Sequence, residues 1–115
     1  MQYLLMIHAD ENAFAKMQPS DAEKGMAAYN AYTAALKEAG VYVGGQRLRP
    51  TATATVVRAA NGKTSVLNGP YAEVKEALAG YYLIDAADLD AAIGWAARCP
   101  GAQHGAIEVR PIWPT

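Results

Sequence analysis

The chain has 115 residues, of which 52% are hydrophobic and 18% charged, so it can bury a core and is not disordered. Ten basic and eleven acidic residues leave a formal net charge of -1, which removes the electrostatic case for a nucleic-acid or anionic-membrane partner. A single cysteine excludes a disulfide framework, no apolar run is long enough to span a bilayer, and the first segment lacks the basic start of a secretion signal. Together these features predict one cytoplasmic domain over residues 1–115.

The first predicted element is a strand from Gln2 to His8, which is a short apolar run. Tyr3, Leu5 and Ile7 lie on one face of the strand, and Leu4 and Met6 lie with His8 on the other, so both faces are apolar. A strand on a half-solvated sheet would alternate with polar residues. We therefore expect both faces of this strand to be covered.

A long helix is predicted after an irregular segment. Residues 9–19 lack a stable period and contain Pro19, which favours a loop. Ser20 and Glu23 form a capping box that predicts the start of the helix, and Gly40 predicts its end. The expected apolar stripe follows spacings of four and three and comprises Ala22, Met26, Tyr29, Thr33 and Leu36.

The rest of the chain predicts strands, a hairpin and a second helix. The strands are expected at Val41–Leu48, Thr53–Arg58, Lys63–Leu67, Ala79–Asp85 and Ala106–Ile112. Asn61-Gly62 is a strong hairpin turn signal, and Asp88 can cap a helix from Leu89 to about Arg98.

Without the hairpin, the predicted order is β-α-β-β-α-β, the ferredoxin-like order of the α+β class. Helices then cover only one face of an antiparallel sheet. Because the first strand is apolar on both faces, we predict a homodimer in which the open sheet faces of two copies pack together.

The two histidines are the natural general-base candidates, because histidine titrates near neutral pH unaided. His8 ends the first strand two residues before Asp10, which could orient the ring, so His8 and Asp10 are the candidate catalytic pair. The alternative is a histidine exposed at a strand end. His104 lies between glycines 101 and 105, where a solvated loop is the simpler interpretation.

No motif indicates a metal, a nucleotide or another cofactor, so none is expected. The histidines lack metal-ligand spacing, and no glycine-rich nucleotide-binding motif is present. Cys99, at the predicted end of a helix, is interpreted as a small buried hydrophobe.

Two further patterns permit two interpretations each. Glu108 and Arg110 share one face of the last strand, where they can form an ion pair, or Arg110 can clamp an anion together with Arg47 and Arg49. The seven tyrosines are either ordinary core residues or the lining of a polar-tipped cavity.

The segment Asn68–Glu76, N-G-P-Y-A-E-V-K-E, is followed by G-Y-Y-L-I at residues 80–84. Together these segments resemble the signature of DGPF-domain proteins in the YCII-related family. The beginning Y-L-L-M-I and the ending G-A-I-E-V-R-P-I are also typical, so the similarity covers essentially the whole chain. Asn68 replaces the Asp of the name-giving motif and keeps a turn-forming side chain. Tyr71 replaces the Phe and keeps the aromatic ring.

The resemblance implies a dimeric α/β barrel of ferredoxin-like subunits. The His–Asp pair proposed for some YCII-branch proteins does not transfer, because the first long helix offers Tyr29 and Tyr32 but no histidine. Cys99-Pro100 also stands where that branch tends to show Asp-Pro.

Two functions remain open at this point, and whether the protein is an enzyme remains open with them. The first is binding of a small molecule in a cleft of the dimeric barrel, with proton transfer by His8 or Asp10. The candidate ligand-binding residues are Arg47, Arg110, Tyr71, Glu73 and Glu76. The second is a non-catalytic accessory or interaction domain, since DGPF domains also occur beside sigma-factor-type regulators.

Overall fold

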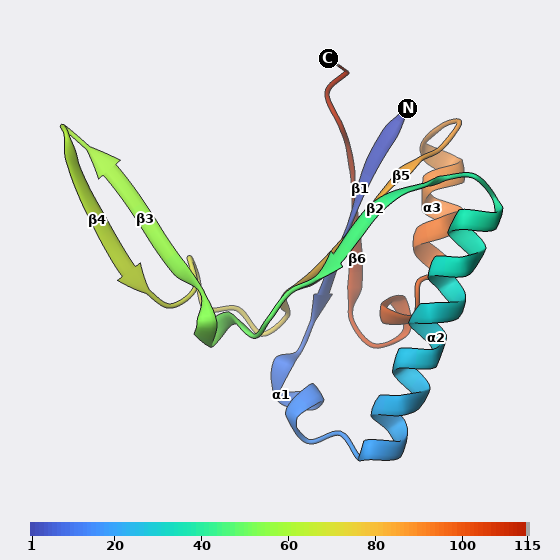
Figure 1. The fold of residues 1–115 in the computed structure, drawn as a ribbon, viewed down its shortest axis with the longest axis horizontal. Coiled ribbons are helices and arrows are strands. Elements are labelled where there is room, and N and C mark those ends of the chain that lie inside the picture. Colours follow the sequence, from blue (N-terminus) through green and yellow to red (C-terminus); the bar gives the residue numbers. More distant parts are fainter. Residues whose placement is uncertain (115) are drawn as a thin grey trace.

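A four-stranded antiparallel sheet forms the centre of the molecule in the computed structural model, which describes residues 1–114 (Figure 1). Its strands are β1 (Gln2–Ala9), β2 (Tyr42–Arg47), β5 (Ala77–Asp85) and β6 (Ala106–Pro111). They are arranged in the order β2-β5-β1-β6. Strands β3 (Thr55–Ala60) and β4 (Lys63–Asn68) form a separate hairpin.

Three helices connect these strands: α1 (Glu11–Ala15), α2 (Pro19–Glu38) and α3 (Leu89–Arg98). The two longer helices lie on the same side of the four-stranded sheet (Figure 1). With the hairpin and the short α1 set aside, the element order is β-α-β-β-α-β. This arrangement confirms the predicted ferredoxin-like α+β fold.

The core fills the space between the sheet and helices α2 and α3. Leu5 of β1, Ile84 of β5 and Leu36 of α2 are fully buried there. Tyr32 contributes an edge-to-face pair with Tyr82, in which the ring centroids are 5.3 Å apart. Burial of these side chains is the main source of stabilisation for the sheet-helix layer pair.

Strand β1 is buried on one face and only half-buried on the other. Tyr3, Leu5 and Ile7 pack under the helices, whereas Leu4 and Met6 lie on the open face of the sheet. Both faces carry apolar side chains, as predicted, but this chain supplies a cover for only one of them.

Two predictions for the segment before α2 are wrong. Residues 11–15 form α1 instead of a loop, because the Asp10 carboxylate caps this helix and accepts a 2.9 Å hydrogen bond from the backbone N–H of Asn12. Helix α2 begins at Pro19, and Gln18, not Ser20, is its N-cap. The fixed φ of proline suits the first helical position, which places the start of α2 before the capping box.

The inward face of α2 also differs from the predicted stripe. Tyr32 and Leu36 are buried and Thr33 is half-buried, but Met26 is 51% exposed. The first half of α2 extends past the sheet, so its residues have no core to enter (Figure 1).

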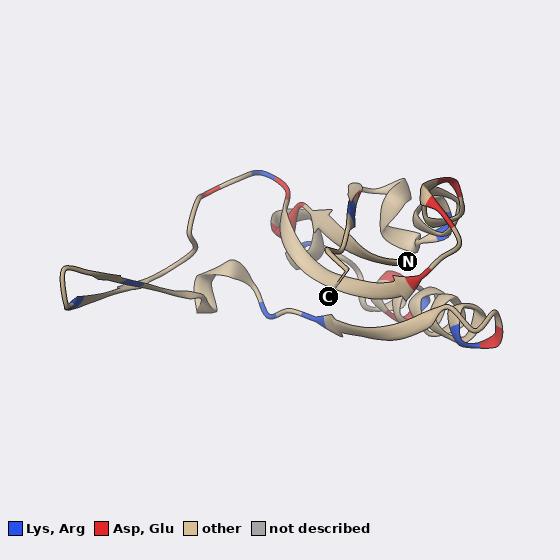
Figure 2. Cartoon of the chain, turned by 90° about the horizontal axis from the view of Figure 1, so that it is seen from above, with Lys and Arg blue, Asp and Glu red and all other residues tan. Residues whose placement is uncertain are grey.

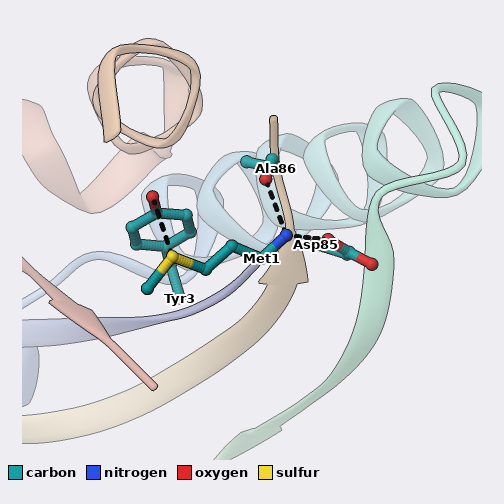
Figure 3. Close-up of polar contacts among 4 residues, drawn as sticks. All are labelled: Met1, Tyr3, Asp85 and Ala86. Carbon is teal, nitrogen blue, oxygen red and sulfur yellow. Dashed lines mark hydrogen bonds and ion pairs between the residues drawn. The ribbon is translucent and has the colours of Figure 1, made fainter. Parts of the chain in front are cut away.

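The start of β1 is attached to the end of β5 (Figure 3). The α-amino group of Met1 lies 2.8 Å from Oδ1 of Asp85 and donates to the carbonyl oxygen of Ala86 at 3.1 Å. The Tyr3 hydroxyl contacts the Met1 sulfur at 3.7 Å. These contacts keep the first residues of the chain in register with β5.

The hairpin, residues 55–68, forms an arm that projects from the body (Figure 1). Asn61 and Gly62 have φ values of 52° and 75°, the left-handed geometry of a two-residue type I′ turn, and this confirms the predicted hairpin. Glu11 of α1 holds the base of the arm, where its carboxylate accepts hydrogen bonds from the backbone N–H and the Oγ1 hydroxyl of Thr51, both at 2.8 Å.

Candidate functional site

A groove of about 660 Å³ lies where the base of the arm meets the end of the sheet. The end of β1 supplies one wall, and the segments that enter and leave the arm supply the others. Most of the lining is apolar; the polar or charged side chains include His8, Arg49, Thr51, Tyr71 and Glu76. A volume of this size matches sites for small organic molecules.

His8 is joined to a carboxylate on the neighbouring strand. Its Nε2 atom lies 3.2 Å from Oε1 of Glu108 on β6. Strands β1 and β6 pair antiparallel with Glu108 opposite Met6, so Glu108 and His8 are diagonal neighbours on the open face of the sheet. The same carboxylate accepts a hydrogen bond from the Arg110 guanidinium through Oε2.

This bridging position determines the charge of Glu108. Hydrogen bonds from Arg110, and secondly from His8, stabilise the charged form and lower the pKa of the Glu108 carboxyl below its ordinary value. The carboxylate is therefore ionised at neutral pH and can only accept in this contact, so the Nε2–H of the His8 ring donates the hydrogen bond. No hydrogen bond to Nδ1 of His8 is found within residues 1–114.

The other candidate residues lie in the groove, in a recess beside it or at the start of α1. Tyr71 and Glu76 line the groove with His8, while Glu73 lines a smaller recess of about 290 Å³ that shares Thr51 and Pro70 with it. Asp10 caps α1, and no hydrogen bond between it and His8 is found in the part of the chain that the structure describes.

Within a single chain, the arginines of the candidate anion clamp lie apart. Arg47 lies on β2 and Arg110 on β6, and these strands are the two opposite edges of the sheet. Arg49, two residues after Arg47, does line the groove. Of the side chains that line the groove with His8, Arg49 is the one that carries a Lys or Arg cation.

The contact between His8 and Glu108 is the feature that sequence reasoning missed. The residues are one hundred positions apart, and only the pairing of β1 with β6 makes them neighbours. The alternation of β6 placed Glu108 and Arg110 on one face, which the structure confirms, but it did not identify the neighbouring strand.

Buried tyrosines surround Cys99 on the helix side of the sheet. The thiol is 1% exposed and lies 4.0 Å from the Tyr29 hydroxyl, and burial raises its pKa. Burial likewise raises the pKa of Tyr29 and Tyr32, and the Tyr82 hydroxyl pairs with Thr33 Oγ1 at 2.7 Å. These groups are neutral parts of the core, which confirms the interpretation of Cys99 as a small buried hydrophobe.

Within residues 1–114, no three His, Cys, Asp or Glu side chains converge in a group that could hold a metal ion. None of the helices in that range has both the length and the apolar character of a membrane-spanning helix.

Comparison with known proteins gives two matches. The family description "YCII-related domain" matches residues 1–115. A protein of Rhizobium meliloti (strain 1021), which carries the description "uncharacterized", is 37% identical to this chain over 114 residues. That alignment covers 97% of this chain and 92% of the Rhizobium protein.

Proposed function

The chain belongs to the YCII-related family, and from this membership and the geometry of the groove we propose that it binds a small molecule beside His8. In this proposal His8 transfers a proton to or from the bound molecule. The observation that carries the proposal is the hydrogen bond between His8 and an ionised Glu108 at the wall of a groove of small-molecule size.

The ligand is a small carboxylic acid with an apolar body. Apolar side chains at the end of β2 and the start of β5, such as Leu48 and Leu78, suit the body of the ligand. The guanidinium of Arg49 at the same groove suits its carboxylate, because the planar fork can donate two parallel hydrogen bonds.

His8 acts as the general base in this site. Because Glu108 accepts a hydrogen bond from Nε2–H, the neutral ring keeps its lone pair on Nδ1, where it can take a proton from the ligand. The same carboxylate then stabilises the imidazolium that forms. Glu108 is thus a positioning residue, and Arg110 holds it.

The working unit is a homodimer in the cytoplasm. Leu4, Met6, Tyr81 and Leu83 are half-buried on the open face of the sheet, and a second copy packed there would cover them. Face-to-face packing also places His8, Glu108 and Arg110 between the two sheets, where less water reaches them.

A thermal-shift screen with aromatic and aliphatic carboxylic acids tests the proposal. Acids that bind the native protein raise Tm, because a ligand present at about 100 times its Kd stabilises by ~2.7 kcal/mol. We expect Arg49→Ala to abolish the rise and His104→Ala, which changes the histidine outside the groove, to retain it. If no acid at millimolar concentration raises Tm, the site proposal is wrong and the accessory-domain alternative gains support.

A further inference from the structure

The arm of residues 55–68 has no role in the proposed chemistry. It projects to one side of the four-stranded sheet while α2 and α3 lie to the other (Figure 1). Viewed from above, it remains a thin extension separate from the body (Figure 2). The arm and the open face of the sheet are therefore both available on the side that the helices leave free.

The whole chain exposes more surface than a monomer of its mass should. Its accessible surface is 8250 Å² for 12.2 kDa, whereas folded monomers of that mass expose about 6,100 Å². Its radius of gyration is 16.1 Å, against about 13 Å for a compact domain of this length. The excess area is larger than the ~800 Å² that each partner buries in a standard interface.

One face of the arm is free of charge. Val57 pairs with Val66, and the flanking pairs on that face are Thr55 with Asn68 and Ala59 with Thr64. The opposite face carries the two charged residues of the arm, Arg58 and Lys63, beside the apolar pair Val56 and Leu67. Figure 2 shows these cations and no acidic residue on the hairpin.

The apolar side chains on the uncharged face are open to solvent in a single chain. Val57 is 61% exposed and Val66 is 63% exposed. A two-stranded hairpin without further packing is only marginally stable in water. A partner that covers this face would bury the two valines and would also stabilise the hairpin.

We propose that the arm docks through its uncharged face on a second copy of this chain, so that two arms clasp the dimer. This inference rests on the homodimer of the proposed function. A copy packed on the open sheet face stands on the same side as the arm, so one partner meets both surfaces. A two-fold axis then repeats the contact and accounts for the excess area without another protein.

Docking of the arm also shapes the groove. Thr51 and Tyr71, next to the two ends of the arm, are part of the groove lining. A partner that fixes the arm therefore fixes one wall of the small-molecule site, and dimerisation and ligand binding strengthen each other.

Sedimentation equilibrium of the intact chain over a range of concentrations tests the arm contact. The test variant, Val57→Lys with Val66→Lys, adds two charges to the uncharged face. The matched control, Ala60→Lys with Ser65→Lys, adds the same two charges to the opposite face of the same hairpin. We expect the test variant to raise the dimer dissociation constant about tenfold or more and the control to leave it unchanged. Far-UV circular dichroism verifies that the body stays folded in both.

The outcomes separate the arm contact from the dimer itself. If the wild type is dimeric and both variants have the same dissociation constant as the wild type, the arm contact is overturned and the face-to-face homodimer stands. Equal weakening by both variants also overturns it, because the effect would then come from charge alone. A wild type that is monomeric at every concentration overturns the homodimer and the arm contact together.

Discussion

At the scale of single residues, Glu108 binds two groups at once: the ring of His8 and the guanidinium of Arg110. Both contacts favour its charged form, so the carboxylate remains ionised, and the His8 ring donates its Nε2–H to it. Cys99, by contrast, has a raised pKa and almost no exposed surface. The pKa of Glu108 is thus lowered and that of Cys99 raised, and each shift leads to a testable prediction.

The lowered pKa of Glu108 predicts a pH-dependent contribution to folding. A carboxyl whose pKa is depressed in the folded state stabilises above its unfolded value of about 4.3, and this stabilisation disappears as pH falls through the folded pKa. Glu108→Gln should therefore be less stable than wild type at neutral pH, and this difference should shrink as pH falls below about 4.3. Urea unfolding at neutral pH and at a series of lower pH values measures the difference, and a difference that does not change with pH would contradict the contact.

The burial of Cys99 predicts a thiol that does not react in the native protein. A disulfide reagent such as 5,5′-dithiobis(2-nitrobenzoate) requires an accessible thiolate, and this thiol is both buried and raised in pKa. We expect no labelling in buffer at pH 8 and one equivalent in denaturant. Rapid labelling without denaturant would show that the pocket around Cys99 opens.

At the scale of elements, the β2–β5 pairing requires glycine at one position only of the pair Gly44-Gly45. A Cβ on Gly45 would lie 2.9 Å from the carbonyl oxygen of Tyr81 and 2.9 Å from the ring of Tyr82. A Cβ on Gly44 would meet nothing within 4 Å. The neighbouring glycines are thus a matched pair for substitution.

Gly45→Ala should destabilise the fold by about 1–3 kcal/mol, because the backbone of β5 cannot move aside cheaply. Gly44→Ala should change the free energy of unfolding by less than about 1 kcal/mol. Denaturant titration of both variants provides the comparison. Equal effects would show that the two strands are not in this register.

The attachment of α1 to the arm is a second element-scale contact. Hydrogen bonds to a charged acceptor contribute ~1.5 kcal/mol or more, and Glu11 accepts two from Thr51. Glu11→Ala should accelerate hydrogen exchange at the Thr51 amide about tenfold or more. Glu23→Ala, which removes an exposed carboxylate from α2, is the control and should leave that amide unchanged.

Local patterns predicted most elements, because each depends on neighbouring residues. Asn61-Gly62 identified the hairpin and Asp88 the start of α3, where its carboxylate accepts from the Ala91 N–H at 2.8 Å. The predicted start of α2 was wrong because Pro19 and Ser20 give competing signals one residue apart. Periodicity also could not show that the sheet ends before Met26 of α2.

At the scale of the whole molecule, the candidate site depends on pairings that connect distant parts of the chain. His8 and Glu108 meet only through the β1–β6 register, and Arg49 reaches the groove because the chain turns out of β2 into the arm. The alternation of β6 allowed an ion pair between Glu108 and Arg110, but no local pattern could indicate that the same carboxylate also contacts His8. The exposure of the open sheet face and of the arm is likewise visible only in the complete fold, because no single element shows that both stay uncovered.

The most direct test of the site uses the two histidines of the wild-type protein as internal probes. His8 lines the groove, and His104 is exposed and is not part of its lining. In a proton–carbon NMR spectrum of the imidazole groups at constant neutral pH, we titrate a carboxylic acid that raises Tm. We expect the His8 signal to shift to saturation while the His104 signal stays in place. A saturating acid that leaves the His8 signal unmoved would show that it does not bind beside His8.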